Sequence, residues 1–184
     1  MKRLFDILCA AAGLCLFGWL IFALVLLVRR DSPGPGIFAQ ERVGQGGRVF
    51  VCYKLRTMRA GTVSAASHET PRTAVTALGA RLRGTKLDEL PQLWNVLVGD
   101  MSLVGPRPCL PTQLELVAER QARGVYAIRP GITGLAQVQG IDMSDPLRLA
   151  AIDAEYLRDQ SFTGDLRLIL RTLTGGGRGD RVAL

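Results

Sequence analysis

The chain has 184 residues, enough for one domain of ordinary size with a substantial buried core. Its 23 lysine and arginine residues against 16 acidic ones give a formal net charge of +7, which favours anionic partners such as phosphorylated small molecules, acidic lipid or nucleic acid. The four cysteines lack CxxC spacing and a nearby histidine, which argues against a zinc site and against a disulfide framework.

The first predicted element is a membrane segment. From Leu4 to Val28 the chain runs for 25 residues with Asp6 as its only charge, longer than the ~20 residues that cross a bilayer as a helix. The run is too long for the apolar part of a signal peptide, and no small-residue cleavage site follows it. We therefore expect this segment to remain in the mature protein.

Positive charges flank the segment on both sides, and such charges prefer the cytoplasmic face of a membrane. The flanking residues are Lys2, Arg3, Arg29 and Arg30. Both ends thus favour the same face, which predicts a re-entrant membrane helix over residues 1–30 that bends near its middle. The helix-weakening residues available for the bend are Gly13 and Gly18. A single straight span, with one flank overruled, is the alternative.

Residues 31–174 are predicted to form one domain, because the breaker cluster "DSPGPG" ends the helix. Two short strands follow, Ile37 to Arg42 and Arg48 to Met58, joined by the glycine-rich "VGQGG", a pattern typical of a β-hairpin. Alternation along the second strand places Lys54 and Arg56 on one face, where they could converge on one anion. A solvated strand face is the alternative.

Residues 58–76 are polar and without a period, which predicts a mobile loop. The only histidine of the chain, His68, lies there and is interpreted as a solvated loop residue. The following "ALGARLRG" predicts a short helix that ends at Gly84.

From Lys86 to Gly99 apolar residues recur at helical spacing, which predicts another helix. Asp88 and Glu89 lie on its polar side, and their neighbouring positions let the two acids take different tasks. Pro91 disturbs the backbone bonding of such a helix, so its start stays open.

Three further helices are predicted, in "QLELVAERQARG", "DPLRLAAIDAEYLRD" and "SFTGDLRLILRTLTGG". Residues 175–184 are glycine-rich and predict a flexible C-terminal tail. The elements together indicate an α+β fold, a small and mostly helical cytoplasmic domain with a short β-hairpin, anchored by the N-terminal re-entrant helix.

Two arginine-proline motifs suit anion binding. Arg107 lies between two prolines in extended backbone, where its planar guanidinium could grip a phosphate. Arg129 precedes a turn in which Gly131 and Gly134 would let backbone N–H groups approach an oxyanion. Taken alone, either motif is equally explained as a structural turn.

The adjacent acids Asp88 and Glu89 have an ordinary explanation too, since acids are favoured in the first turn of a helix. Acids able to hold Mg²⁺, basic groups for phosphate oxygens and a membrane insert together indicate phosphoryl transfer to a lipid. The alternative is a non-catalytic, membrane-anchored basic module that binds anionic lipid or nucleic acid. Such a module has no use for acids beside its basic groups.

Four runs in the chain, "KRLFD", "YKLRTM", "LDELPQLWNVLVGDMSLVGPRP" and "RPGITGLAQVQG", occur in the order known from one family. On these runs, and from about residue 2 to about residue 173, the chain resembles the bacterial sugar transferases of the monotopic phosphoglycosyl transferase family. It is similar to the minimal form, a membrane insert with a catalytic domain.

The resemblance implies transfer of a phosphosugar from a UDP-sugar to polyprenyl phosphate, with release of UMP and a requirement for Mg²⁺. Asp88 would be the nucleophile, and Glu89 a catalytic residue and metal ligand. The substrate-binding residues would be Lys54, Arg56, Arg83, Arg107, Arg129, Gln137 and Asp153. The resemblance also implies the bacterial inner membrane, an active site on its cytoplasmic face and no nucleic-acid partner, and it leaves a homodimer open.

Two positions depart from the family pattern. Gly18-Trp19 stands where the family has a mid-membrane Ser-Pro break, and Lys86 replaces a small residue before "LDE". The sugar and the glycan pathway are not specified by the sequence.

Overall fold

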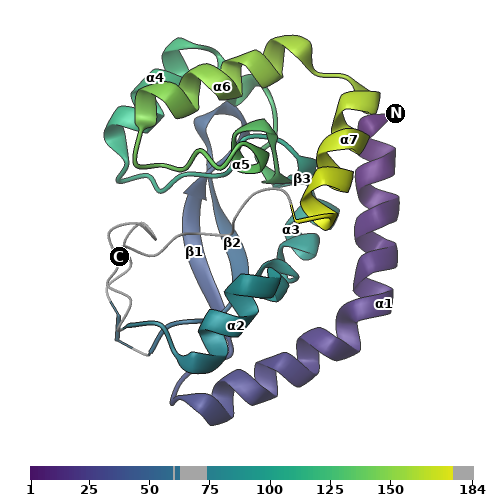
Figure 1. Cartoon of the computed structure of the whole chain (residues 1–184), viewed down its shortest axis with the longest axis vertical. Helices are drawn as coiled ribbons and strands as arrows, with labels where there is room; N and C mark the ends of the chain where they lie inside the picture. Colours follow the sequence, from purple (N-terminus) through teal and green to yellow (C-terminus); the bar gives the residue numbers. More distant parts are fainter. Residues whose placement is uncertain (60, 63–73, 176–184) are drawn as a thin grey trace.

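The computed structural model describes residues 1–59, 61–62 and 74–175 and has an α+β architecture (Figure 1). Its longer elements are α1 (Lys2–Asp31), β1 (Ile37–Val43), β2 (Val49–Leu55), α2 (Ala77–Thr85), α3 (Gln92–Val98), β3 (Ser102–Val104), α4 (Leu114–Ala122), β4 (Gly131–Thr133), α5 (Leu135–Val138), α6 (Pro146–Asp159) and α7 (Phe162–Leu173). Most of the predicted loop over residues 58–76, His68 included, and residues 176–184 of the predicted tail lie outside the described residues.

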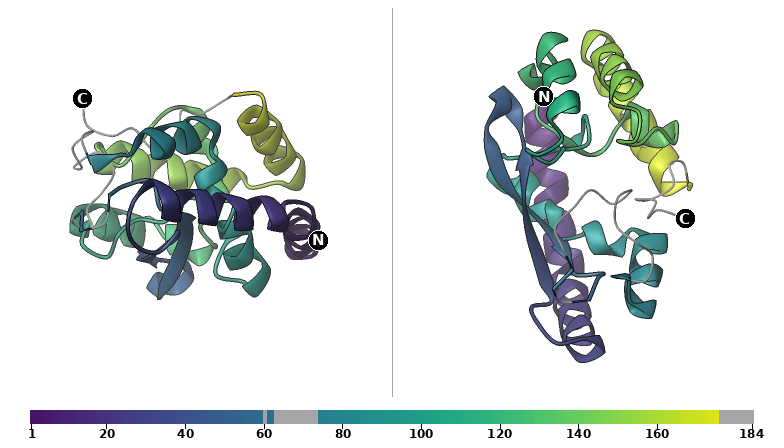
Figure 2. Two further views of the ribbon diagram at one scale, coloured as in Figure 1. Left: turned by 90° about the horizontal axis from the view of Figure 1, so that it is seen from below. Right: turned by 90° about the vertical axis from the view of Figure 1, so that its left-hand side faces the viewer.

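Helix α1 is one continuous element of 30 residues, and Figures 1 and 2 show it bent along its length around one side of the domain. It is long and apolar enough to cross a membrane, and only 11% of its most apolar 18-residue stretch is buried in the protein. Ala10 packs with residues of β2 and α3, whereas Leu24 and Val28 pack with Leu55 and Leu82. Most of the apolar surface of α1 is therefore exposed.

The two glycines of α1 have different surroundings. A Cβ atom on Gly13 would lie 3.0 Å from Cδ1 of Leu93, so the missing side chain lets α1 approach α3 closely. The equivalent position on Gly18 has nothing within 4 Å. Gly13 thus allows α1 to pack closely against α3.

Polar contacts fix both ends of α1 to the same body. At the N-terminal end Lys2 pairs with Asp165 at 2.5 Å, and Arg3 donates to two carbonyls at the end of α3. Asp6 accepts a hydrogen bond from Oγ of Ser102 at 2.8 Å and is itself 2% exposed. At the other end, the last carbonyls of α1 accept hydrogen bonds from an arginine that follows β2. Both ends of α1 are therefore attached to the same domain.

The predicted hairpin is confirmed. β1 and β2 pair antiparallel, beginning with Ile37 opposite Leu55. The turn between them holds Gly46 and Gly47 at φ of 68° and 73°, a left-handed conformation that favours glycine. β2 ends at Leu55, and Met58, the predicted end, instead forms an isolated bridge beyond the strand.

The segment predicted as one helix from Lys86 to Gly99 is two elements, the 3-10 turn η4 (Leu87–Glu89) and α3. α3 begins immediately after Pro91, because proline suits the start of a helix and not its interior. The three later helices form where predicted. Asp145 and Ser161 accept hydrogen bonds from the first turns of α6 and α7.

Figure 1 shows α4 and α6 at the turn end of the hairpin and α7 beside the N-terminal end of α1. α3 contacts both β2 and α1. The core under α4 and α6 is built from small and medium apolar side chains, namely Val43, Cys109, Leu116, Tyr126, Ala136, Leu149 and Ala150. This packing leaves η4 and the loop after β3 facing each other across β2.

Candidate active site

Asp88 and Glu89 lie in η4, where the chain reverses between α2 and α3. The reversal is made by Lys86, which ends α2 with a left-handed φ of 59°, a conformation that costs an L-residue about 1 kcal/mol. Asp88 is 7% exposed and the side chain of Glu89 is 13% exposed. Because α3 starts three residues later with no acid in its first turn, the helix dipole does not explain this pair.

Glu89 accepts hydrogen bonds from two cations that come from distant parts of the chain. Its Oε1 lies 2.6 Å from Nη2 of Arg107 and 3.3 Å from Nζ of Lys54. Lys54 is on β2 and Arg107 follows β3, so the hairpin, η4 and the "GPRP" segment meet at one carboxylate. Three of the predicted site residues are therefore brought together.

The two arginine-proline motifs are neighbours in space, because β3 and β4 pair as a parallel two-stranded sheet. The glycines around them permit the contact: a Cβ on Gly105 would lie 2.4 Å from the Arg129 carbonyl, and one on Gly131 would lie 2.0 Å from the Gly105 nitrogen. The N–H of Gly131 donates to the Pro106 carbonyl at 2.9 Å. The prediction that Gly131 and Gly134 expose N–H groups to an oxyanion is wrong for Gly131, whose N–H is used within the sheet.

Arg83 lies one turn before the dyad, near the end of α2. Its Nε donates to Oγ1 of Thr57 at 2.9 Å, whereas its buried Nη1 has no hydrogen-bond partner within the described residues. A buried guanidinium nitrogen without an acceptor is costly, and a phosphate oxygen would satisfy it. Substrate binding by Arg83 stays a prediction.

Arg129 and Gln137 lie on the β4 side of the site. Nε of Arg129 donates to the Gly99 carbonyl at 2.8 Å, and Nε2 of Gln137 donates to the Ile132 carbonyl at 2.8 Å. Oε1 of Gln137 is buried and has no hydrogen-bond partner among the described residues. These described contacts hold the loops around β4, and substrate contact by either side chain stays a prediction.

The structure does not support a substrate-binding role for Arg56. Its side chain is 7% exposed and donates to the carbonyls of Val28 at 3.2 Å, Ser32 at 2.6 Å and Pro33. Val28 lies in the last turn of α1, and Ser32 and Pro33 follow the helix, so the guanidinium caps the end of α1 and holds the segment that leaves it. Lys54 and Arg56 therefore do not converge on one anion.

The prediction that Asp153 contacts substrate is also corrected. Asp153 is 2% exposed, and its Oδ2 accepts hydrogen bonds from Nη2 and Nε of Arg120 at 2.6 and 2.9 Å. Arg120 is 1% exposed, and we did not single it out from the sequence. The available signal was its spacing, since Arg120 lies four residues after the buried Leu116, on the apolar side of α4.

One thiol lies close to these groups. Burial raises the pKa of Cys52, with Lys54 opposing that shift. Cys52 is 2% exposed and therefore remains a neutral core residue and not a nucleophile.

The family model described as bacterial sugar transferase matches residues 1–177. The chain belongs to this family. The match confirms the resemblance seen in the four sequence runs and covers α1 together with the whole described domain.

Relatives of this sugar transferase carry names that describe sugar or sugar-phosphate transfer. It is 41% identical over 182 residues to the UDP-glucose:undecaprenyl-phosphate glucose-1-phosphate transferase of Caulobacter vibrioides, covering 94% of this chain and 68% of that protein. It is 38% identical to galactosyl transferase CpsE of Streptococcus agalactiae, with 94% and 41% covered. It is 37% identical to the UDP-N-acetylgalactosamine-undecaprenyl-phosphate N-acetylgalactosaminephosphotransferase of Aeromonas hydrophila, with 96% and 44% covered. The chain thus spans less than half of the last two proteins.

The geometry of this sugar transferase fits a site for a metal-bound diphosphate. No group of three or more potential metal ligands occurs in the part of the chain that the structure describes, so the protein offers no complete cage. Mg²⁺ commonly binds through one or two carboxylates plus substrate phosphates, and the consecutive acids Asp88 and Glu89 of η4 supply carboxylates of this kind. The donor set at η4 therefore fits Mg²⁺ brought with a diphosphate.

Proposed function

We propose that this sugar transferase moves a phosphosugar from a UDP-sugar to polyprenyl phosphate and releases UMP, as the first membrane step of glycan assembly. The reaction proceeds through a covalent aspartyl-phosphosugar intermediate on Asp88. Mg²⁺ supports it, and it takes place at the cytoplasmic face of the bacterial inner membrane. Family membership supports the general reaction, and the relatives named above supply the substrate class.

The observation that carries the proposal is the shared carboxylate oxygen of Glu89, held by Arg107 at 2.6 Å and by Lys54 at 3.3 Å. Two cations and a carboxylate in contact form an anion site that is already compensated in the free protein. An incoming diphosphate gives both cations new acceptors, and it leaves Glu89 able to hold the metal that accompanies the diphosphate. Asp88, the adjoining acid, then lies beside the bound phosphorus.

In the first displacement an oxygen of Asp88 attacks the β-phosphorus of the UDP-sugar. The bond from the β-phosphorus to the bridging oxygen breaks, and UMP leaves with that oxygen and its electron pair. Arg107 and Lys54 stabilise the negative charge that develops on the phosphoryl oxygens. The product of this step is the acyl phosphate of Asp88 with the sugar attached.

In the second displacement a phosphate oxygen of polyprenyl phosphate attacks the phosphorus of that adduct. The bond to Asp88 breaks, the carboxylate is regenerated, and polyprenyl diphosphosugar leaves. Glu89 would hold Mg²⁺ together with the diphosphate, and the metal when bound neutralises phosphate charge. Two adjacent acids suit this sequence because one is consumed as nucleophile while the other keeps its charge.

The membrane location rests on α1. Its apolar residues are exposed along the bent helix, with Trp19 70% and Phe22 66% exposed, and such a surface requires lipid around it. Both ends bond to the catalytic domain through Lys2, Arg3, Asp6 and Arg56. A helix that crossed the bilayer would carry one end at least ~30 Å away from the domain, so the contacts favour entry and return on one face.

Intact-mass analysis after incubation with UDP-sugar and Mg²⁺, without lipid, tests the covalent step. We expect a phosphosugar adduct and UMP in the wild-type enzyme, and neither in Asp88→Asn. Asp159→Asn, a change of an exposed acid on α6, is the matched control and should form the adduct normally. An Asp88→Asn enzyme that still turns over would overturn the assignment, and a panel of UDP-sugars in the same assay identifies the donor.

Cysteine labelling in a cysteine-free background tests the topology of α1. We expect a cysteine added ahead of Met1 and one at Arg30→Cys to react only with reagent on the cytoplasmic side. Arg158→Cys, on the exposed side of α6, reports the side of the catalytic domain. Labelling of the N-terminal cysteine from the periplasm would contradict the re-entrant arrangement.

A further inference from the structure

Hydrogen bonds hold the backbone on both sides of Arg107. Each of the four consecutive carbonyls from Pro106 to Cys109 accepts a hydrogen bond from a different donor. The pairs are Pro106 O with Gly131 N (2.9 Å), Arg107 O with Arg120 Nη1 (2.8 Å), Pro108 O with Arg42 Nη1 (3.0 Å) and Cys109 O with Val43 N (2.9 Å). The prolines on either side of Arg107 remove two N–H groups, so carbonyl contacts hold this segment.

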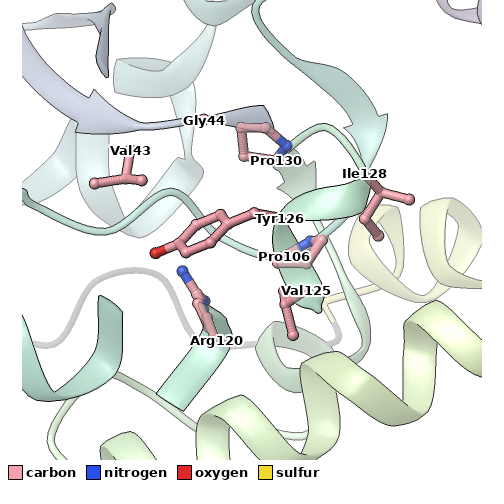
Figure 3. A pocket seen from close by; sticks show the side chains of 8 residues that line it. All are labelled: Val43, Gly44, Pro106, Arg120, Val125, Tyr126, Ile128 and Pro130. Atoms are coloured by element: carbon pink, nitrogen blue, oxygen red, sulfur yellow. The ribbon is translucent and has the colours of Figure 1, made fainter. Parts of the chain in front are cut away.

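Arg120, which donates to the Arg107 carbonyl, is the more buried of the two arginine donors. Arg120 uses Nη1 for the Arg107 carbonyl and its other two hydrogen-bonding nitrogens for Asp153. Figure 3 shows the Arg120 guanidinium directed towards the Tyr126 hydroxyl, in a small pocket that Pro106 and Pro130 also line. Burial raises the pKa of Tyr126, which keeps this phenol neutral beside Arg120. The pocket contains neither Asp88 nor Glu89 and lies behind the backbone of Arg107.

A buried pair of this kind is a poor device for stability alone. Removing two charges from water is costly, and well-packed apolar side chains often stabilise a core as well or better. The arrangement acquires a purpose from its third hydrogen bond, since a planar guanidinium can grip Asp153 and still reach the Arg107 carbonyl. While its backbone carbonyl is held by Arg120, the side chain of Arg107 extends to Glu89, with Nη2 2.6 Å from Oε1.

We propose that Arg120, oriented by Asp153, is a positioning residue that fixes the backbone of Arg107 and thereby the place at which the Arg107 guanidinium meets the donor diphosphate. The proposal rests on the function proposed above, in which Arg107 binds phosphate. Neither Arg120 nor Asp153 touches substrate. Asp153 acts indirectly, because it orients Arg120 on α4, and Arg120 in turn holds the Arg107 carbonyl in the "GPRP" segment.

An apolar replacement of the pair separates positioning from stability. In Arg120→Met/Asp153→Val both charges are removed together and the summed side-chain volume is nearly kept, so we expect a folded enzyme with a similar melting temperature. The Arg107 carbonyl loses its donor, and kcat should fall roughly tenfold to a hundredfold while KM for the UDP-sugar changes less than about threefold. A wild-type kcat in a folded double variant would overturn the proposal.

A second measurement asks whether the effect passes through Arg107. In an Arg107→Ala background the same pair replacement should cause no further loss in single-turnover UMP formation, because the group being positioned is gone. Losses that multiply would show that the pair acts on the fold in general and would overturn the proposal. If the apolar pair does not fold, Arg120→Lys takes its place, since an ammonium keeps the charge but lacks the fork that serves both acceptors.

The same variants keep the two proposals apart. Arg107→Ala with a wild-type rate contradicts the phosphate-binding role of Arg107, and with it the function as proposed, whatever Arg120 does. A slow Arg107→Ala enzyme with multiplying losses contradicts only the positioning. Arg123→Gln, which changes the exposed partner of Glu119 at the C-terminal end of α4, is the matched control and should leave kcat unchanged.

Discussion

Glu89 and Asp153 of this sugar transferase each pair with an arginine from a distant part of the chain, and the two pairs differ in kind. Glu89 shares one oxygen between Arg107 and Lys54, and the three side chains are 13%, 18% and 15% exposed. The side chains of Asp153 and Arg120 are 3% and 2% exposed, and their ion pair is made by two hydrogen bonds to a single oxygen. The Glu89 pair, called the exposed pair below, keeps part of its surface in solvent, whereas the buried pair is enclosed between α4 and α6.

The difference shows which of the two can exchange partners. The cations on Glu89 come from separate segments and are partly exposed to water, so under the proposed function they can transfer to a phosphate without unfolding of the domain. Arg120 cannot release Asp153 without leaving a buried charge unpaired. The exposed pair is thus suited to chemistry and the buried pair to holding the chemistry in place, and each of the following tests acts on one side of this contrast.

Removal of metal should have the largest effect and should act only on the exposed pair. With excess chelator we expect turnover to fall at least about a thousandfold, since the diphosphate charge is no longer neutralised. Added Mg²⁺ or Mn²⁺ should restore it. The melting temperature should stay the same, because the described residues contain no carboxylate cluster that needs a metal to fold. Full turnover in chelator would remove Mg²⁺ from the proposed function.

Removal of the buried acid should have the largest effect on folding. Asp153→Ala leaves Arg120 charged and unpaired, which should lower the free energy of unfolding by about 3–5 kcal/mol. Lys54→Met at the exposed pair should lower it by less than about 1 kcal/mol, since Arg107 remains on Glu89. Chemical denaturation of the two variants in the same detergent gives the comparison, and equal losses would show that the two pairs do not differ in kind.

Arg107→Lys keeps the positive charge of the exposed pair and changes only its shape. We expect turnover to fall about tenfold to a hundredfold, because an ammonium cannot make the paired hydrogen bonds of a guanidinium to phosphate. Stability should be nearly unchanged. A wild-type rate of UMP formation would reduce "GPRP" to a structural turn.

The smallest effect is expected at Lys86, which sets the geometry of the exposed pair from the backbone. Lys86→Gly relieves the left-handed strain at φ of 59° and should raise the free energy of unfolding by about 0.5–1 kcal/mol. Lys86→Ala keeps the strain and is the control. If both variants unfold at the same denaturant concentration as the wild type, the backbone at position 86 stores no measurable strain.

The sequence by itself determined the local elements. The alternation and glycines of the hairpin and the helical periodicity of α4, α6 and α7 each depend on residues close in the chain. The same holds for the exposed apolar helix α1 and for the adjacency of Asp88 and Glu89. Periodicity and capping are local properties, so they are visible without the fold.

The tertiary structure alone decided which charged residues meet. Lys54 and Arg56 look equivalent on one strand, yet one reaches Glu89 and the other caps α1, because different segments pack over them. β3 and β4 have three residues each, too short for any period to reveal, and their pairing explains the glycines that the sequence assigned to an anion. Asp153 is buried because α4 packs against α6 and brings Arg120 to it. Contacts between residues far apart in the chain depend on how helices and strands pack, and no local pattern specifies that.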